Sequence, residues 1–314
     1  YILSIAIIAN IIPLIYIHIT LVKEGLKVLM SSQRPASIII RDFLNKSSIS
    51  SEDIAFAIAP RINSAGRLED ASIALDIIIS DNINTAYNQC ELLGKINELR
   101  KEPEAECTTE CMAMADSNAD VIVVANENWH EGVVGIVAAR LVDKFGRPAI
   151  VLSIKDGVAK GSARSIGEVS IYELIKASEH LLTKFGGHKM AAGLGLLEEN
   201  IERFTKEINK TATILEPKDF EPKEALTGVL NSDDIDLELL NLLETFEPYG
   251  EANLRPRFLV QDAEVISIKL MGKDKSHTRI EIKQNSHERK TIEINTFRTG
   301  YEIQEHKKLT ISSK

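Results

Sequence analysis

The stretch from Phe185 to Gly193, Phe-Gly-Gly-His-Lys-Met-Ala-Ala-Gly, constrains this chain more than any other. Two adjacent glycines allow backbone conformations that other residues avoid, and they let the backbone approach a ligand closely. The histidine that follows can donate a hydrogen bond at neutral pH in either tautomer. Gly-rich loops of this kind often bind phosphate. The sequence therefore predicts a phosphate-binding loop at Gly186, Gly187 and His188, with a tight turn carrying a surface histidine as the alternative.

Composition indicates a globular protein of about two domains. The 314 residues are 44% hydrophobic and 26% charged. The net charge of −9 argues against a uniformly basic DNA-coating protein but allows a local basic groove. The segment from Gln261 to Lys314 carries a small excess of basic residues. Cys90, Cys107 and Cys111 lack zinc-finger spacing, which predicts reduced thiols in a cytoplasmic protein.

The N-terminal segment from Tyr1 to Val22 contains no formally charged side chain. Its many isoleucines favour a buried strand with flanking turns, and Pro13 interrupts the run. A membrane-spanning helix is the alternative, because the uncharged length is sufficient for one. No basic region precedes the segment, so a signal peptide is not expected.

Two helical regions are expected next. Glu52 to Ser80 has apolar residues at helical intervals, with Gly66 breaking the pattern beside Arg67. Thr85 to Ala115 is polar and predicts a long exposed helix, in which Pro103 marks a kink or a break.

A strand, a helix and a second strand follow in order and predict a βαβ-like unit. Ligands commonly bind at the carboxyl ends of such strands, which places Trp129 and His130 near a site. The alternative is that Trp129 is a core aromatic residue and His130 caps the helix. The expected elements are a strand over Val121–Val124, a helix over Val133–Phe145 ended by Gly146, and a strand over Ala149–Leu152.

A further strand over Val158–Ser165 carries Ser162 and Arg164 between small residues. A hydroxyl and a guanidinium are both good donors to phosphate, so this strand is a second candidate for the site. Helices are expected over Ile171–Thr183 and Glu199–Leu215.

Alternating apolar residues dominate after Phe258 and predict half-buried antiparallel strands, preceded by a short helix over Asp233–Phe246. This pattern suits a small barrel of the OB type. The tail after Phe297 is polar, so the barrel is expected to end early. The strands cover Val265–Leu270, Arg279–Lys283 and Thr291–Ile294, with hairpin turns at Gly272–Asp274 and Gln284–Ser286.

Five stretches resemble, in order, the motifs of the DHH/DHHA1 phosphoesterase family, and within it the exonucleases specific for single strands. They are Arg61–Leu68, Trp129–Ala138, Gly161–Ser165, Phe185–Gly193 and Glu247–Asn253. The resemblance implies an α/β protein with four parts. These are the C-terminal part of a DHH catalytic domain (1–83), a connecting helix (84–116), a DHHA1 substrate-binding domain (117–216) and an incomplete OB-fold domain (217–314).

The same resemblance implies a site for the 5′-terminal phosphate of DNA, and it places a metal ligand near the N-terminus. The metals implied for the full-length enzyme are Mn²⁺ or Mg²⁺. Asn10 stands where the family has an aspartate ligand, and Ala252 and Leu254 replace the family's usual Gly and Pro. No catalytic residue is intact, so the chain is expected to be a fragment that is inactive alone. The substrate-binding residues implied are Arg67, His130, Ser162, Arg164, Gly186, Gly187 and His188.

The function implied is metal-dependent 5′–3′ hydrolysis of single-stranded DNA in repair and recombination, with this chain supplying the DNA-binding half. The implied partners are single-stranded DNA, a single-strand-binding protein and a helicase, and no membrane. One alternative is a DHH phosphoesterase acting on short RNA or cyclic dinucleotides. Another is a nucleic-acid-binding remnant without catalysis.

Overall fold

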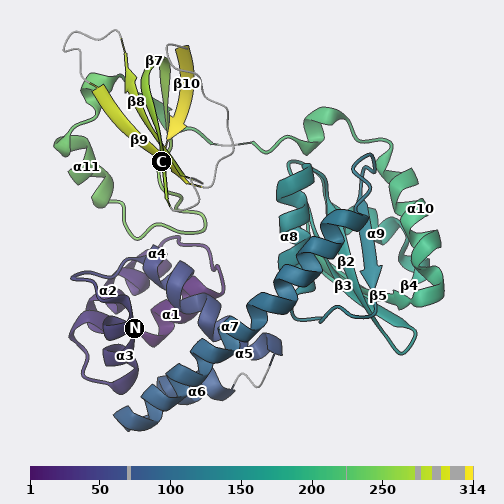
Figure 1. Ribbon diagram of the computed structural model, residues 1–314. Coiled ribbons are helices and arrows are strands. Elements are labelled where there is room, and N and C mark those ends of the chain that lie inside the picture. Colours follow the sequence, from purple (N-terminus) through teal and green to yellow (C-terminus); the bar gives the residue numbers. More distant parts are fainter. Residues whose placement is uncertain (69–71, 224, 273–276, 285–290, 298–307, 314) are drawn as a thin grey trace. The chain divides into compact units, whose positions relative to one another are not determined.

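The computed structural model describes residues 1–68, 72–223, 225–272, 277–284, 291–297 and 308–313 (Figure 1). The chain forms two compact units, each assembled from segments that are distant in the sequence. One unit contains Tyr1–Leu29, Ser48–Ile54 and Glu224–Lys314, and the other contains Met30–Ser47 and Ala55–Lys223. The fold class is α/β, as predicted. The four-part division by residue number stays a prediction.

The uncharged N-terminal segment is helical, so the predicted strand is wrong. Helix α1 spans Ile2–Ala9 and helix α2 spans Ile17–Ser31, with Pro13 between them. A run that is apolar throughout has no alternation from which to choose between strand and helix, and the isoleucines biased the prediction towards strand. No helix in the described part of the chain combines the length and hydropathy needed to cross a membrane.

The predicted helical regions are confirmed, with three differences. Gly66 lies inside α5 and does not interrupt it, and Pro103 lies inside α7 without ending it. Helix α7 is also less exposed than expected, because it buries residues such as Leu93 and Cys107. The elements are α3 (Pro35–Leu44), α4 (Ser51–Asp53), a π-helical turn (Ile54–Ile58), α5 (Ala59–Leu68), α6 (Ser72–Ile79) and α7 (Ile83–Met114).

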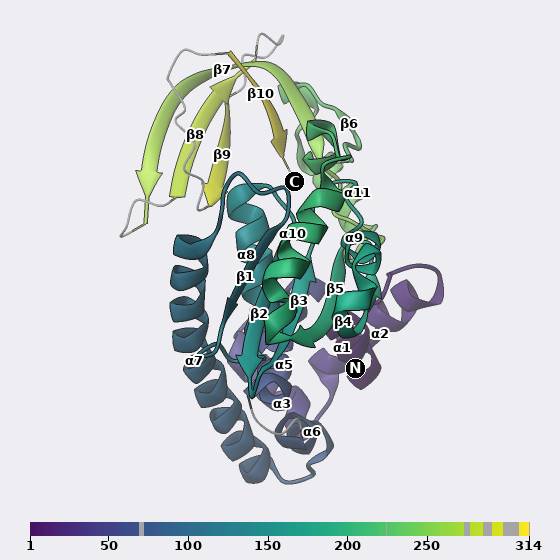
Figure 2. The same ribbon diagram turned by 90° about the vertical axis from the view of Figure 1, so that its right-hand side faces the viewer.

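A five-stranded mixed sheet follows α7, with the strand order β1-β2-β3-β5-β4 (Figure 2). The predicted βαβ unit is confirmed, since α8 joins the parallel strands β1 and β2 and ends at Gly146, whose φ is 62°. The other neighbouring strands are antiparallel. The elements are β1 (Ile122–Asn126), α8 (Val134–Phe145), β2 (Ala149–Lys155), β3 (Val158–Arg164), β4 (Leu182–His188) and β5 (Ala191–Leu197).

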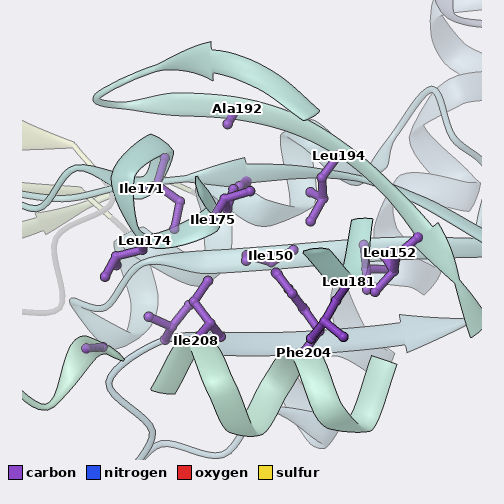
Figure 3. Packing of buried hydrophobic residues seen from close by; sticks show 14 of the residues in the cluster. Ile150, Leu152, Ile171, Leu174, Ile175, Leu181, Ala192, Leu194, Phe204 and Ile208 are labelled. Atoms are coloured by element: carbon purple, nitrogen blue, oxygen red, sulfur yellow. The ribbon is translucent and has the colours of Figure 1, made fainter. Parts of the chain in front are cut away.

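Apolar side chains pack on both faces of this sheet. Helices α9 (Ile171–Ala177) and α10 (Ile201–Ala212) cover one face, and Figure 3 shows Phe204 and Ile208 of α10 against Ile150 of β2. Helix α8 covers β2 and part of β3 on the other face, where Val137 and Leu141 pack with Val151. The predicted helix over Ile171–Thr183 ends earlier, at Ala177. The polypeptide then forms a short 3₁₀ turn and enters β4.

The C-terminal sheet has the order β10-β7-β8-β9, and β6 also pairs with β7. The expectation that the barrel ends early is wrong, because β10 pairs with β7. Strand β7 bends at a bulge near Asp262, whose φ is 52°, as barrel strands often do. The predicted hairpin turns lie largely outside the described residues. The elements are β6 (Gly228–Val229), α11 (Leu237–Glu244), β7 (Phe258–Met271), β8 (His277–Lys283), β9 (Thr291–Phe297) and β10 (Lys308–Ser313).

Candidate nucleic-acid interface

Strands β3, β5 and β4 present a polar face on the side of the sheet that faces α8. Residues that pair directly across neighbouring strands lie on the same face of a sheet, and so does every second residue along each strand. Their partners in the other alternation, such as Ala163 and Leu194, are buried under α9 and α10. Three rows result, namely Arg164–Ala191–His188, Ser162–Gly193–Gly186 and Lys160–Gly195–Lys184. We call this surface the open face, because Lys160, Lys184, Gly186, His188 and Gly193 are all exposed.

Arg164 and Ser162 lie together under the first turn of α8. The Arg164 guanidinium donates from Nη1 to the Ser162 hydroxyl at 2.7 Å and to the Ala163 carbonyl at 2.8 Å. Gly135, in the first turn of α8, faces both residues, and a Cβ placed there would lie 3.1 Å from Arg164 Nη2 and from Ser162 Oγ. Helix α8 begins at Val134, and its N-cap residue, Val133, makes no side-chain capping hydrogen bond. A guanidinium, a hydroxyl and the amide end of a helix therefore converge, and this combination suits an anion.

The predicted glycine–histidine loop is a strand. Gly186, Gly187 and His188 belong to β4, and the turn to β5 contains only Lys189 and Met190. Adjacent glycines usually indicate a turn, but here both lie in a strand, and the second of them allows close pairing with β5. At Gly187, with φ of 150°, a Cβ would lie 2.5 Å from Cα of Ala192 and closer still to the Ala191 carbonyl. At Gly186 a Cβ would meet nothing within 4 Å, so that position leaves the open face uncovered.

His188 lies in the same row as Arg164, with Ala191 between them. Two strand spacings separate their Cα atoms by about 10 Å. The hairpin that carries His188 is held by an ion pair between Lys189 and Glu168. The hydrogen bond from Lys189 holds the pKa of the Glu168 carboxyl below its usual value, with Lys223 contributing.

The loop after β1 is fixed by Trp129 and exposes His130. Trp129 is 5% exposed, and its indole N–H donates to Glu110 at 2.6 Å. Its backbone carbonyl accepts from the Ser153 hydroxyl at 2.5 Å. Trp129 is therefore a core aromatic residue, which was the alternative interpretation. His130 Nδ1 accepts from the Gly132 amide at 3.0 Å, so the neutral ring carries its proton on Nε2 and can donate it outwards.

Arg67 lies in helix α5, and its side chain is outside the described part of the structure. The structure therefore brings Ser162, Arg164, Gly186, Gly187 and His188 onto one face. It places His130 in the loop that precedes α8.

The position predicted for a metal ligand does not fit a metal. The Asn10 amide donates to the Ala6 carbonyl at 2.9 Å at the end of α1. Across the residues that the structure describes, no group of three or more His, Cys, Asp or Glu side chains is arranged to hold a metal ion.

Sequence reasoning missed several residues of the open face. Lys160 and Lys184 form its third row, on either side of Gly195, and Gly135 contacts the Arg164–Ser162 pair. The alternation of small and large residues in β5, Ala-Ala-Gly-Leu-Gly-Leu-Leu, is a signal that could have revealed a strand with one open side.

Comparison with known proteins gives consistent matches along the chain. Residues 118–213 match the DHHA1 domain model, and residues 226–313 match the RecJ OB domain model. RecJ of Bacillus subtilis, a single-stranded-DNA-specific exonuclease, is 36% identical over 244 residues, which is 75% of this chain and 31% of that protein. RecJ of Haemophilus influenzae is 30% identical over 296 residues, which is 87% of this chain and 50% of that protein.

The crystal structure of RecJ from Thermus thermophilus in complex with Mg²⁺ matches with a TM-score of 0.86 at 28% identity, over 98% of this chain and 47% of that one. The chain belongs to the RecJ family. It spans half or less of the length of these RecJ relatives. The same Thermus RecJ was also solved with Mn²⁺, so divalent cations accompany structures of the family. The match to the RecJ OB domain model favours RecJ over the alternative interpretation, a DHH phosphoesterase that acts on short RNA or cyclic dinucleotides.

Proposed function

We propose that this chain is the strand-binding half of a RecJ-type exonuclease, and that its open face holds the 5′-terminal phosphate of single-stranded DNA. The observation that carries the proposal is the convergence of Arg164, Ser162 and the first turn of α8. His188, in the same row as Arg164, supplies a donor on the far side of the bound phosphate. His130 provides a further donor from the loop before α8. We propose that Arg67 also contacts the terminal phosphate.

Each group contributes to phosphate binding in a different way. The Arg164 guanidinium is planar and always charged, and it can donate two parallel hydrogen bonds to phosphate oxygens. The uncapped amides of α8 add a partial positive charge. Phosphate contacts position a strand without reading its bases, so we expect little sequence preference. The C-terminal barrel would hold the strand further along, as barrels of this type do.

In the full-length enzyme we propose Mn²⁺- or Mg²⁺-dependent hydrolysis of phosphodiester bonds from the 5′ end, in cytoplasmic DNA repair and recombination. A single-strand-binding protein and a helicase are the partners that we propose for it. We expect the isolated chain to cleave nothing, because an amide at Asn10 is a poor ligand for hard cations. Manganese-dependent degradation of DNA by the purified chain would contradict this expectation.

The binding site is tested with the variant Arg164→Ala and oligothymidylates that carry either a 5′ phosphate or a 5′ hydroxyl. We expect the parent chain to prefer the phosphorylated strand, and the variant to bind it about 10- to 100-fold more weakly, since charged hydrogen bonds are strong. Arg203→Ala is the matched control, because Arg203 is exposed on α10, which packs against the opposite side of the sheet. Equal affinities of Arg164→Ala and the parent chain, measured by fluorescence anisotropy, would refute the site.

A further inference from the structure

The third row of the open face places two lysines on either side of a glycine. Lys160 of β3 and Lys184 of β4 both pair with Gly195 of β5. The aliphatic part of Lys184 lies along Gly195, since a Cβ there would be 3.2 Å from Cγ and 3.4 Å from Cε of the lysine. Both lysines are exposed, so their ammonium groups are accessible from the side that carries Arg164.

The two lysines differ in their partners. Lys160 forms an ion pair with Glu131, with Nζ 3.2 Å from Oε1 and 3.4 Å from Oε2. Lys184 has no ion pair within the described part of the chain. Glu131 belongs to the loop between Trp129 and α8, and both members of its ion pair are about half exposed, at 55% and 48%. The Glu131 carboxylate therefore contacts Lys160, the lysine that an incoming phosphate would also contact.

We propose that Lys160 and Lys184 form a second phosphate subsite for the same strand, and that Glu131 occupies Lys160 until a backbone phosphate displaces it. The inference rests on the proposed function, because the strand must enter from the Arg164 row. Exposed ion pairs contribute little to stability, so separating Glu131 from Lys160 costs little. The bound phosphate interacts with two cations, whereas the Glu131 carboxylate interacts with one.

The spacing of the rows determines which phosphate reaches the lysines. Arg164 and Lys160 are four positions apart on β3, which is about 13 Å along the strand. A stacked single strand advances about 3.4 Å per nucleotide, so its fourth or fifth phosphate would reach the lysine row, and an extended strand would reach it sooner. A mononucleotide bound at Arg164 cannot reach this row.

The test measures affinity for 5′-phosphorylated oligothymidylates of increasing length, from the mononucleotide to the hexanucleotide, over a range of salt concentrations. The variants are Lys184→Ala, Lys160→Ala and Glu131→Gln, all in the full chain. The matched controls are Lys206→Ala and Glu202→Gln, which alter an exposed Lys–Glu ion pair on α10. Thermal unfolding of each variant verifies that it folds.

We expect Lys184→Ala and Lys160→Ala to bind the mononucleotide like the parent chain and the hexanucleotide severalfold more weakly. The negative slope of log affinity against log salt concentration should become shallower by about 0.7 for each phosphate that the variant no longer neutralises. Glu131→Gln should bind the hexanucleotide more tightly than the parent chain, and the α10 controls should change neither affinity. Arg164→Ala should weaken binding at every length.

Two results would overturn the subsite while leaving the proposed function intact. In the first, the lysine variants bind the hexanucleotide with the parent's affinity and salt slope while Arg164→Ala still binds weakly. In the second, Glu202→Gln raises affinity as much as Glu131→Gln, which would show a general effect of charge. If Arg164→Ala retains full affinity at every length, the proposed function itself is wrong.

Discussion

Strand β5 has two sides that differ completely in what they contact. Ala192, Leu194 and Leu196 point into the core beneath α9 and α10. Ala191, Gly193 and Gly195 alternate with them and form the central line of the open face. One strand of seven residues therefore contributes both to the packing of the domain and to its candidate site.

The difference shows how one strand can fill a core on one side and leave a flat, open face on the other. Small residues on β5 keep the centre of the face low, so the longer side chains of β3 and β4 border it on two sides. Those side chains are Lys160, Ser162, Arg164, Lys184 and His188. The buried side needs large side chains to fill the core, whereas the open side needs small residues that leave the face uncovered.

The largest effect should come from the buried side. Phe204→Ala removes a fully buried ring that packs against the sheet, and it should lower the free energy of unfolding by about 3–5 kcal/mol. Chemical denaturation of the parent and variant measures this change. A cost below about 1 kcal/mol would show that the face under α10 is not the core that the structure indicates.

The adjacent glycines of β4 should behave differently. Gly187→Ala forces a Cβ into the backbone of β5 at a positive φ, and it should cost about 1–3 kcal/mol of stability. Gly186→Ala is the matched control, and it should change stability little, because its Cβ points into open space. Similar losses for both variants, again measured by denaturation, would contradict the pairing of β4 with β5.

Filling the open face should separate binding from stability. Gly193→Leu places a side chain in the central row, where a Cβ meets only the Gly161 carbonyl at 3.9 Å. We expect the variant to fold, and to bind 5′-phosphorylated strands about tenfold or more weakly through steric exclusion, which corresponds to about 1.4 kcal/mol. Circular dichroism and anisotropy measure the two properties. A folded variant with unchanged affinity would place the strand elsewhere.

The smallest effect concerns the end of the hairpin. Because Lys189 lowers the pKa of Glu168 in the folded state, ionised Glu168 stabilises the fold above its unfolded pKa. This contribution is lost as the pH falls below about 4.5 and through the lowered value. Glu168→Gln should therefore remove a small, acid-sensitive part of the stability. Parent and variant melting curves that differ equally at neutral and acidic pH would contradict this.

Local patterns in the sequence predicted much of the sheet domain. The apolar run before Asn126, the amphipathic helix α8 and its glycine end were all visible, because each depends on residues close together in the chain. Ser162 and Arg164 were also correctly placed on one strand. Their roles in binding stay predictions.

The errors arose where distant residues decide the structure. Strand β10 pairs with residues about fifty positions earlier, and nothing in its polar sequence indicates that partner. The glycines of β4 indicated a turn until their pairing with β5 was known. Lys160 and Lys184 are neighbours only through the register of three strands, which no local pattern contains.

The most direct test of the proposed phosphate site is a crystal structure of this chain with a 5′-phosphorylated oligothymidylate. We expect the terminal phosphate to lie within hydrogen-bonding distance of the Arg164 guanidinium and Ser162 Oγ, with the strand crossing β5 over Gly193. A terminal phosphate bound away from β3, with the open face bare, would contradict it.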